Sequence, residues 1–201
     1  MDFPALLRNA GQNDVINIAD FVRQWDESSL DHRYHPSQTQ VIFHLFGYYL
    51  LNKLNEAKFL WKRLPNEFKS ENPHNAELIA TWNLGKNLLK KDLVRAQKKI
   101  NTTHWRDATD LARMLRKKLQ QDAKAVISKT YVSIQIAKAA EMFGINETEL
   151  RPHVERWGWR IENDYVKPTQ TTQITKREVA TDDIQVIGEL VSYLEQKNNL
   201  V

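Results

Sequence analysis

The sequence predicts a mostly helical protein: a stack of repeated helix pairs, then a small α/β module, then a last amphipathic helix. Three observations indicate this fold. Apolar residues recur at helical spacing through the first two-thirds of the chain. The stretch 127–167 has the order short strand, helix, turn, helix and hairpin, which follows a long helix and is typical of a winged helix. Residues 184–194 return to helical spacing after a polar segment.

The winged-helix stretch has clear start and stop residues. Tyr131–Ile134 is short and β-branched, so we expect a strand. The apolar helix that follows, from Ile136 to Phe143, ends at Gly144, a residue that readily takes positive φ at a helix end. Residues 146–149, Asn-Glu-Thr-Glu, have the pattern of a capping box and open a second helix that reaches about Trp157.

A hairpin completes this module. Gly158 ends the second helix, and Trp159–Ile161 and Tyr165–Val166 flank a polar turn at 162–164. Of the two tryptophans beside Gly158, we expect one to fill the core and the other to be partly exposed.

The preceding helices are predicted from their apolar stripes. Asn13 can cap the first one, Pro36 suits the first turn of the next, and Pro65 ends the third. A fourth helix follows around Leu78–Leu89, and Asp92 can cap a fifth.

Two of these segments resemble each other. The stretch around Leu50–Ala57 is similar to Leu88–Ala96, with a period of 39 from Leu54 to Leu93. Such a period lies between those of common helix-pair repeats of the TPR and HEAT types. We therefore expect two stacked helical hairpins, neither of which buries its apolar face alone.

A longer helix, from about Asp107 to Ile127, should join the stack to the winged helix. Its predicted inner stripe is Leu111, Leu115, Leu119, Ala123 and Val126. We divide the chain into a helical-repeat bundle (1–127), a winged-helix subdomain (128–167), a linker (168–180) and a C-terminal amphipathic helix (181–199).

Composition narrows the classes of function. The chain has 201 residues, a net charge of +4 and no cysteine, so a disulfide scaffold, a thiolate zinc site and a cysteine nucleophile are excluded. Met1-Asp2-Phe3-Pro4 does not resemble a signal peptide, and no apolar run approaches the roughly 20 residues that span a bilayer, so we expect no membrane association.

No catalytic pattern stands out. The glycines are isolated, which argues against a phosphate-binding loop, and neither a Gly-x-Ser-x-Gly elbow nor His-Glu-x-x-His occurs. Asp31, His32 and His35 invite a metal site, but the segment is turn-like and no fourth ligand is suggested. We expect no enzyme activity, no metal, no cofactor and no small-molecule substrate.

Nucleic acid is an unfavourable partner for the winged helix. The second helix carries Glu147 and Glu149 at its start and Pro152 inside, and the hairpin adds Glu162 and Asp164. These carboxylates would repel phosphates. The basic stretch from 90 to 124 leaves nucleic-acid binding as a less favoured alternative.

The order of elements resembles the PCI domain, which is found in the proteasome lid, the COP-nine signalosome and initiation factor three. Local words are most similar to the small eighth-subunit family of the signalosome. These words are Ala57–Pro65, Tyr131–Ile134, Phe143–Ile145, Gly158–Trp159 and Tyr193–Glu195. The resemblance covers about 36–166 and the last helix.

The resemblance implies a non-catalytic scaffold subunit, cytoplasmic and nuclear, of the complex that removes Nedd-eight from cullins. Its partners would be other PCI-domain subunits. In that family the winged helices pair edge to edge and the C-terminal helices form a bundle. The implied protein-interface residues are Trp159, Ile161, Tyr165 and Val166 in the wing, and Ile184, Ile187, Leu190, Val191 and Leu194 in the last helix. The alternative is the same domain in initiation factor three or the proteasome lid.

Overall fold

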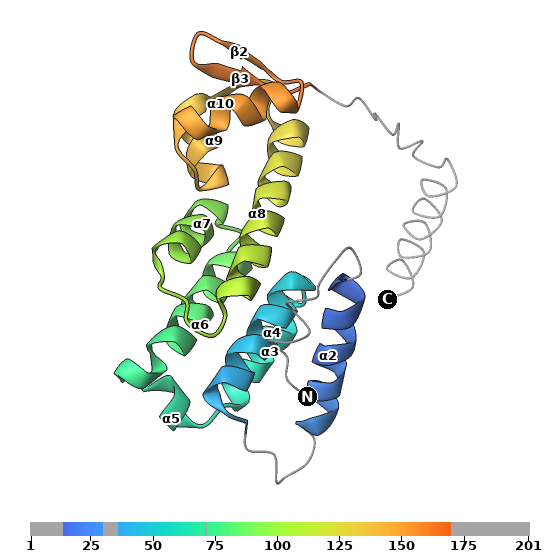
Figure 1. Cartoon of the computed structure of the whole chain (residues 1–201), viewed down its shortest axis with the longest axis vertical. Coiled ribbons are helices and arrows are strands. Elements are labelled where there is room, and N and C mark those ends of the chain that lie inside the picture. Colours follow the sequence, from blue (N-terminus) through green and yellow to red (C-terminus); the bar gives the residue numbers. More distant parts are fainter. Residues whose placement is uncertain (1–13, 30–35, 71, 170–201) are drawn as a thin grey trace, which may run out of the picture. The chain divides into compact units, whose positions relative to one another are not determined.

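The computed structural model describes residues 14–29, 36–70 and 72–169 (Figure 1). The described residues belong to one compact unit that ends at Gln170. The predicted cap at Asn13, the Asp31–His35 segment, most of the linker and the last helix lie outside them. In the part of the chain that the structure describes, no helix is both long and apolar enough to cross a bilayer.

The fold is mostly helical, as predicted, with one small sheet. The helices before the sheet are α2 (Asp14–Ser28), α3 (Gln38–Leu50), α4 (Leu54–Arg63), α5 (Asn66–Lys69), the 3-10 turn η1 (Pro73–Asn75), α6 (Ala76–Leu89), α7 (Leu93–Thr102) and α8 (Thr109–Thr130). The remaining elements are β1 (Ile134–Gln135), α9 (Ile136–Phe143), α10 (Glu147–Arg156), β2 (Arg160–Glu162) and β3 (Tyr165–Lys167).

The two segments related by the 39-residue repeat also have similar backbone conformations at their turns. The turn from α3 to α4 has Asn52 at φ 58°, and the turn from α6 to α7 has Lys91 at φ 56°. The backbone hydrogen bonds across the two turns are also equivalent. Lys53 N donates to Tyr48 O at 2.8 Å in the first turn, and Asp92 N donates to Asn87 O at 3.0 Å in the second. The two helix pairs therefore turn in the same way, and we call α3, α4, α6 and α7 the helical stack.

Helix α8 passes from the helical stack to the module that follows (Figure 1). Leu115 and Leu119 on this helix are buried in the core of the stack, whereas Ala123 and Ile127 are buried in a second core. The prediction for the last turn was wrong: Val126 is exposed, and Ile127 takes the buried position. The buried positions recur every four residues from Leu111 to Ile127. Four residues turn an α-helix by about 400°, so the buried stripe drifts around α8 as the helix passes from the first core to the second.

The second core belongs to β1, α9, α10, β2 and β3, which together we call the α/β module. Its three strands are antiparallel in the order β1-β3-β2, so β3 lies in the middle of the sheet. The hairpin turns at Asn163 and Asp164, which both have positive φ, as a two-residue hairpin turn of type I′ requires. The predicted first strand is shifted: pairing begins at Ile134, and Tyr131 and Val132 are exposed before it.

Two helix ends differ from the prediction. Asn146 stands at the N-cap of α10, but its side chain makes no capping hydrogen bond. The capping box lies instead at α3, where Ser37 accepts from Gln40 N and the Gln40 side chain accepts from Ser37 N. Gly144 ends α9 at φ 64° as expected, and its own carbonyl accepts a hydrogen bond from Asn101 Nδ2 at 2.8 Å.

Candidate protein-interaction surfaces

The four predicted wing residues differ in what they present to solvent. Trp159 and Val166 are buried in the second core, Ile161 packs against it in part, and the Tyr165 side chain is 48% exposed. Trp159 and Val166 therefore hold the sheet on the helices and cannot offer their side chains to a partner. Only Tyr165 and part of Ile161 remain for side-chain contact.

The strand order decides which backbone groups are open. Since β3 pairs with β1 on one side and β2 on the other, Tyr165 and Val166 lie on a strand without a free edge. The sheet edges belong to β2 and β1, and both strands are only two or three residues long. An open edge can accept a strand from another chain, so the outer edge of β2 is the candidate surface for pairing.

Aromatic packing fixes the base of this hairpin. Trp157 lies against Phe143 and Trp159, with ring centroids 5.0 and 5.1 Å apart. The Lys124 ammonium of α8 lies 5.0 Å from the centre of the Trp157 ring. As predicted, one tryptophan fills the core and the other is partly exposed. The hairpin is thereby held by both α8 and α10.

The charged side chains of the hairpin form ion pairs with nearby residues. Lys167 donates a hydrogen bond to Glu162, and this contact lowers the pKa of the Glu162 carboxyl below its usual range. Arg151 on α10 lies 3.7 Å from the Asp164 carboxylate. These pairs are exposed and contribute little stability, but they leave the hairpin surface with opposite charges beside each other rather than with a basic face.

The five predicted positions of the last helix lie outside the described residues. Ile184, Ile187, Leu190, Val191 and Leu194 therefore stay predictions from the sequence pattern.

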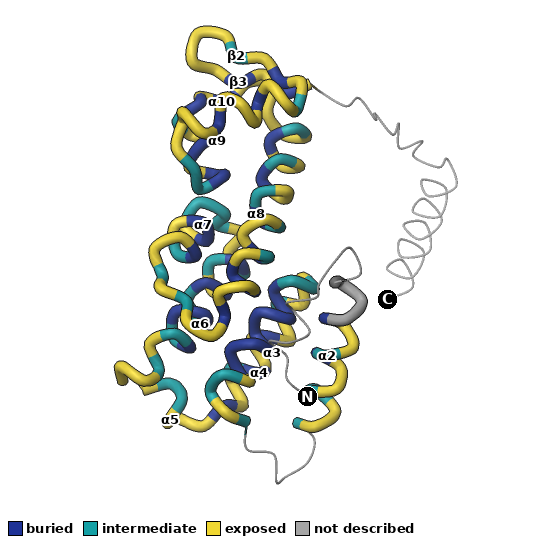
Figure 2. The backbone as a smooth tube through the Cα atoms, viewed as in Figure 1, coloured by how far each residue is buried: buried dark blue, intermediate teal, exposed yellow. Residues whose placement is uncertain are grey.

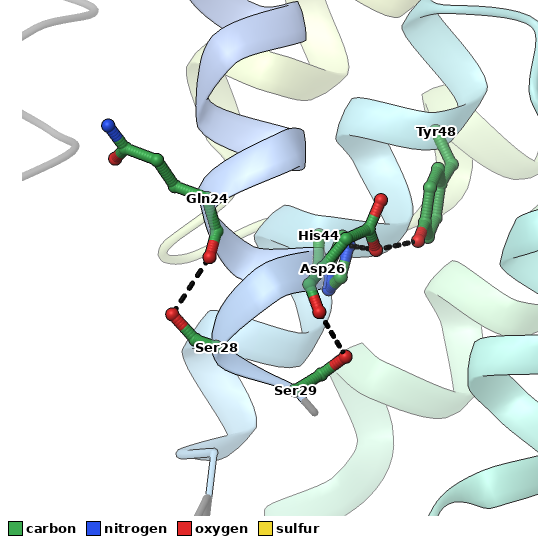
Figure 3. Close-up of polar contacts among 6 residues, drawn as sticks. All are labelled: Gln24, Asp26, Ser28, Ser29, His44 and Tyr48. Atoms are coloured by element: carbon green, nitrogen blue, oxygen red, sulfur yellow. Dashed lines mark hydrogen bonds and ion pairs between the residues drawn. The ribbon is translucent and has the colours of Figure 1, made fainter. Parts of the chain in front are cut away.

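The structure also contains a polar cluster that the sequence analysis did not predict (Figure 3). The Asp26 carboxylate at the end of α2 accepts a hydrogen bond from the Tyr48 hydroxyl and lies 3.1 Å from His44 Nε2, both on α3. The same imidazole stacks on the Tyr48 ring, with centroids 4.5 Å apart. The signal in the sequence was His44 itself, a titratable residue inside an otherwise apolar helix segment.

Burial controls the ionisation of this cluster. Burial lowers the pKa of His44 to about 4, although the Asp26 carboxylate opposes this shift. Burial together with the hydrogen bond to Asp26 raises the pKa of the Tyr48 hydroxyl above its usual range. A neutral His44 and a protonated Tyr48 can both donate to one carboxylate, so the cluster fastens α2 to α3. It places no nucleophile next to an accessible base.

Among the described residues, no group of three or more His, Asp or Glu side chains lies close enough to hold a metal ion. Asp31, His32 and His35 lie outside that part of the chain, so the structure gives no geometry for them.

Comparison with known proteins places this chain in a family. Residues 36–179 match the CSN8/PSMD8/EIF3K family, and the chain belongs to that family. The match contains the helical stack, α8 and the α/β module, and it extends beyond the last described residue.

Several relatives of this chain have the same name. The chain is 27% identical to COP9 signalosome complex subunit 8 of Arabidopsis thaliana over 165 residues, 81% of this chain and 82% of the relative. It is 29% identical to the protein of that name in Xenopus laevis over 76% of this chain and 77% of the relative. The Dictyostelium discoideum protein of that name is 26% identical over 75% of this chain and 76% of the relative.

Proposed function

We propose that this chain is a non-catalytic scaffold subunit of a COP9 signalosome, the complex that removes Nedd-eight from cullins. The observation that carries the proposal is the similarity to subunit 8 over about four-fifths of both chains in the Arabidopsis comparison. The family match over residues 36–179 supports it. We further propose that the protein acts in both cytoplasm and nucleus, where the complex would meet its substrates.

Two surfaces would connect this subunit to other PCI-domain subunits. The first is the edge of the winged-helix sheet, with β2 as the open strand and Tyr165 as the exposed side chain next to it. The second is the C-terminal amphipathic segment, whose apolar positions repeat at helical spacing and would enter a bundle with helices of other subunits. In this arrangement the subunit positions its neighbours, and the chemistry belongs to another chain.

Residue substitutions at each surface test this proposal. Changing Ile187→Asp and Leu190→Asp together should release the full chain from the complex, because two carboxylates would oppose burial of the apolar stripe. Tyr165→Glu should weaken incorporation through the sheet edge. Phe59→Glu is the matched control, because Phe59 on α4 is also an exposed aromatic residue but lies in the helical stack.

The readout is the fraction of tagged variant that co-elutes with signalosome subunits, with circular dichroism to verify folding. Full incorporation of the Ile187→Asp/Leu190→Asp chain would contradict the role of the last helix. Equal losses for Tyr165→Glu and Phe59→Glu would contradict the role of the sheet edge.

The same domain in another assembly is the second candidate, because the family that matches this chain is named for PSMD8 and EIF3K as well as for CSN8. Co-elution with proteasome-lid or initiation-factor subunits would favour it. Nucleic-acid binding has less support, since the acids of the hairpin lie beside its basic residues.

A further inference from the structure

A groove of about 790 Å³ lies between the helical stack and the α/β module. One wall is the side of α8 that carries Leu115, Leu119 and Val126, and the opposite walls are the two equivalent turns α3–α4 and α6–α7 and part of α9. Leu93 and Met142 also line it. The groove is therefore formed by elements from both cores, and its interior is mainly aliphatic.

Apolar surface continues from one end of the groove. Val126 and Tyr131, both in its lining, are 38% and 36% exposed, and Val132 next to them is 74% exposed. Large apolar side chains that cluster on a surface rather than occur singly are typical of a binding site. Figure 2 shows buried, half-buried and exposed positions alternating along α8. Val126, near the C-terminal end of this helix, is one of the exposed positions.

The rim of the groove is positively charged. Lys90, Lys91 and Lys138 line it, and within the described ranges none of the three side chains forms an ion pair or a hydrogen bond. The lining holds more lysines than acids, since Lys118 adds to the three lysines and only Asp92 and Asp122 oppose them. Asp92 caps α7 and pairs with Arg95 at 3.3 Å. The charge of Asp122 raises the pKa of the Lys118 ammonium against the lowering effect of burial.

We propose that this groove binds an acidic amphipathic helix of a partner protein. The apolar face of the helix would lie on Leu93, Val126 and Met142, and its carboxylates would meet the lysines of the rim. A helix in a groove uses apolar anchors one turn apart, and a complementary charge at the rim selects the partner and its orientation. The groove is lined by none of the described residues of β2, and binding there does not depend on which complex contains the chain.

The test uses the full chain and two labelled peptides of 14 residues. Both are designed as helices with leucines on one face; the first carries glutamates on the other face, and the second carries lysines at the same positions. Fluorescence anisotropy should show binding of the acidic peptide and at least about tenfold weaker binding of the basic one. Raising the salt concentration should weaken the acidic complex.

Variants locate the binding. Lys91→Glu with Lys138→Glu should weaken the acidic peptide about tenfold, and Val126→Asp should do the same through loss of an apolar contact. Arg116→Glu with Lys117→Glu is the matched control: it makes the same change in charge on exposed positions of α8 that do not line this groove, and it should change affinity less than about twofold. Thermal unfolding verifies that each variant is folded.

Several results would overturn the proposal. Among them are equal binding of both peptides, no binding at about 1 mM chain, and an equal loss in the Arg116/Lys117 control. Sedimentation that shows a dimer broken by Val126→Asp would assign the groove to a second copy of this chain instead.

Discussion

Among the side chains that the structure describes, His44 links its ionisation to the stability of the fold between about pH 4 and pH 6.5. Its pKa in the folded protein is about 4, against 6.5 for an unperturbed histidine, because burial disfavours the imidazolium. Between these two values the unfolded chain binds the proton and the folded chain does not. This part of the stability is therefore complete above pH 6.5 and is lost as the pH falls toward 4.

From this shift we predict that the free energy of unfolding falls by about 2 kcal/mol between pH 7.5 and pH 5 through His44 alone. His44→Gln keeps a donor for Asp26 but cannot titrate, so the variant should lack this component. Urea denaturation of both proteins at the two pH values measures the difference. The prediction fails if wild type and His44→Gln lose stability equally.

Some single positions could not be predicted from sequence because neighbours decide them. Asn146 has the residue type and spacing of a capping box, yet the structure forms that box at Ser37, where the side chains of Ser37 and Gln40 both reach the backbone. Val126 and Ile127 are equally apolar, and only the direction in which α8 meets the second core buries Ile127.

At the level of helices, the C-terminal end of α3 depends on a lysine from a distant part of the chain. Lys118 Nζ donates to Tyr49 O at 3.1 Å and to Leu50 O at 2.8 Å. A cation at a helix C-terminus meets the negative end of the helix dipole and pairs carbonyls that have no partner within the helix. This contact fastens α8 to the first helix pair.

We predict that Lys118→Met lowers the free energy of unfolding by about 1–2 kcal/mol, since it leaves partly buried carbonyl groups without a charged donor. Lys117→Met, on the exposed side of the same helix, should change it by less than about 0.5 kcal/mol. Equilibrium denaturation in urea compares the two variants. Equal effects would show that the contact with α3 does not stabilise the fold.

The helices and the hairpin could be predicted from local sequence signals, whereas the strand order of the sheet could not. The repeat of 39 residues and the cap at Asp92 indicated the turns where they occur, because helix ends are decided within a few residues. The pairing of β1 with β3 joins residues such as Ile134 and Val166 that are far apart in the sequence. No local pattern reports such a pairing, so the position of β3 at the centre of the sheet came only from the structure. Since β3 is the central strand and Trp159 and Val166 are buried, the part of the predicted wing surface that a partner could reach is Tyr165 and the edge of β2.

For the described unit as a whole, α8 makes the helical stack and the α/β module depend on each other. Its first half is buried in one core and its second half in the other. Two further contacts cross the junction: Asn101 donates to Gly144 O at 2.8 Å, and Gln120 donates to Phe143 O at 3.3 Å. Leu93 packs against both cores.

We therefore predict a single unfolding transition for this unit. Leu119→Ala in the first core and Ile127→Ala in the second should each lower the free energy of unfolding by about 2–4 kcal/mol without separating the transition into two. Helix content by circular dichroism and tryptophan fluorescence should change together in each variant. A variant in which one signal is lost before the other would show that the two cores unfold independently.

The central proposal is that the chain is a structural subunit of a signalosome. Affinity purification of the tagged full chain at moderate salt, with quantitative mass spectrometry of the proteins that accompany it, tests this most directly. We predict signalosome subunits in amounts nearly equal to the chain itself. Recovery of the chain with proteasome-lid or initiation-factor subunits in their place, or as a lone protein bound to nucleic acid, would contradict the proposal.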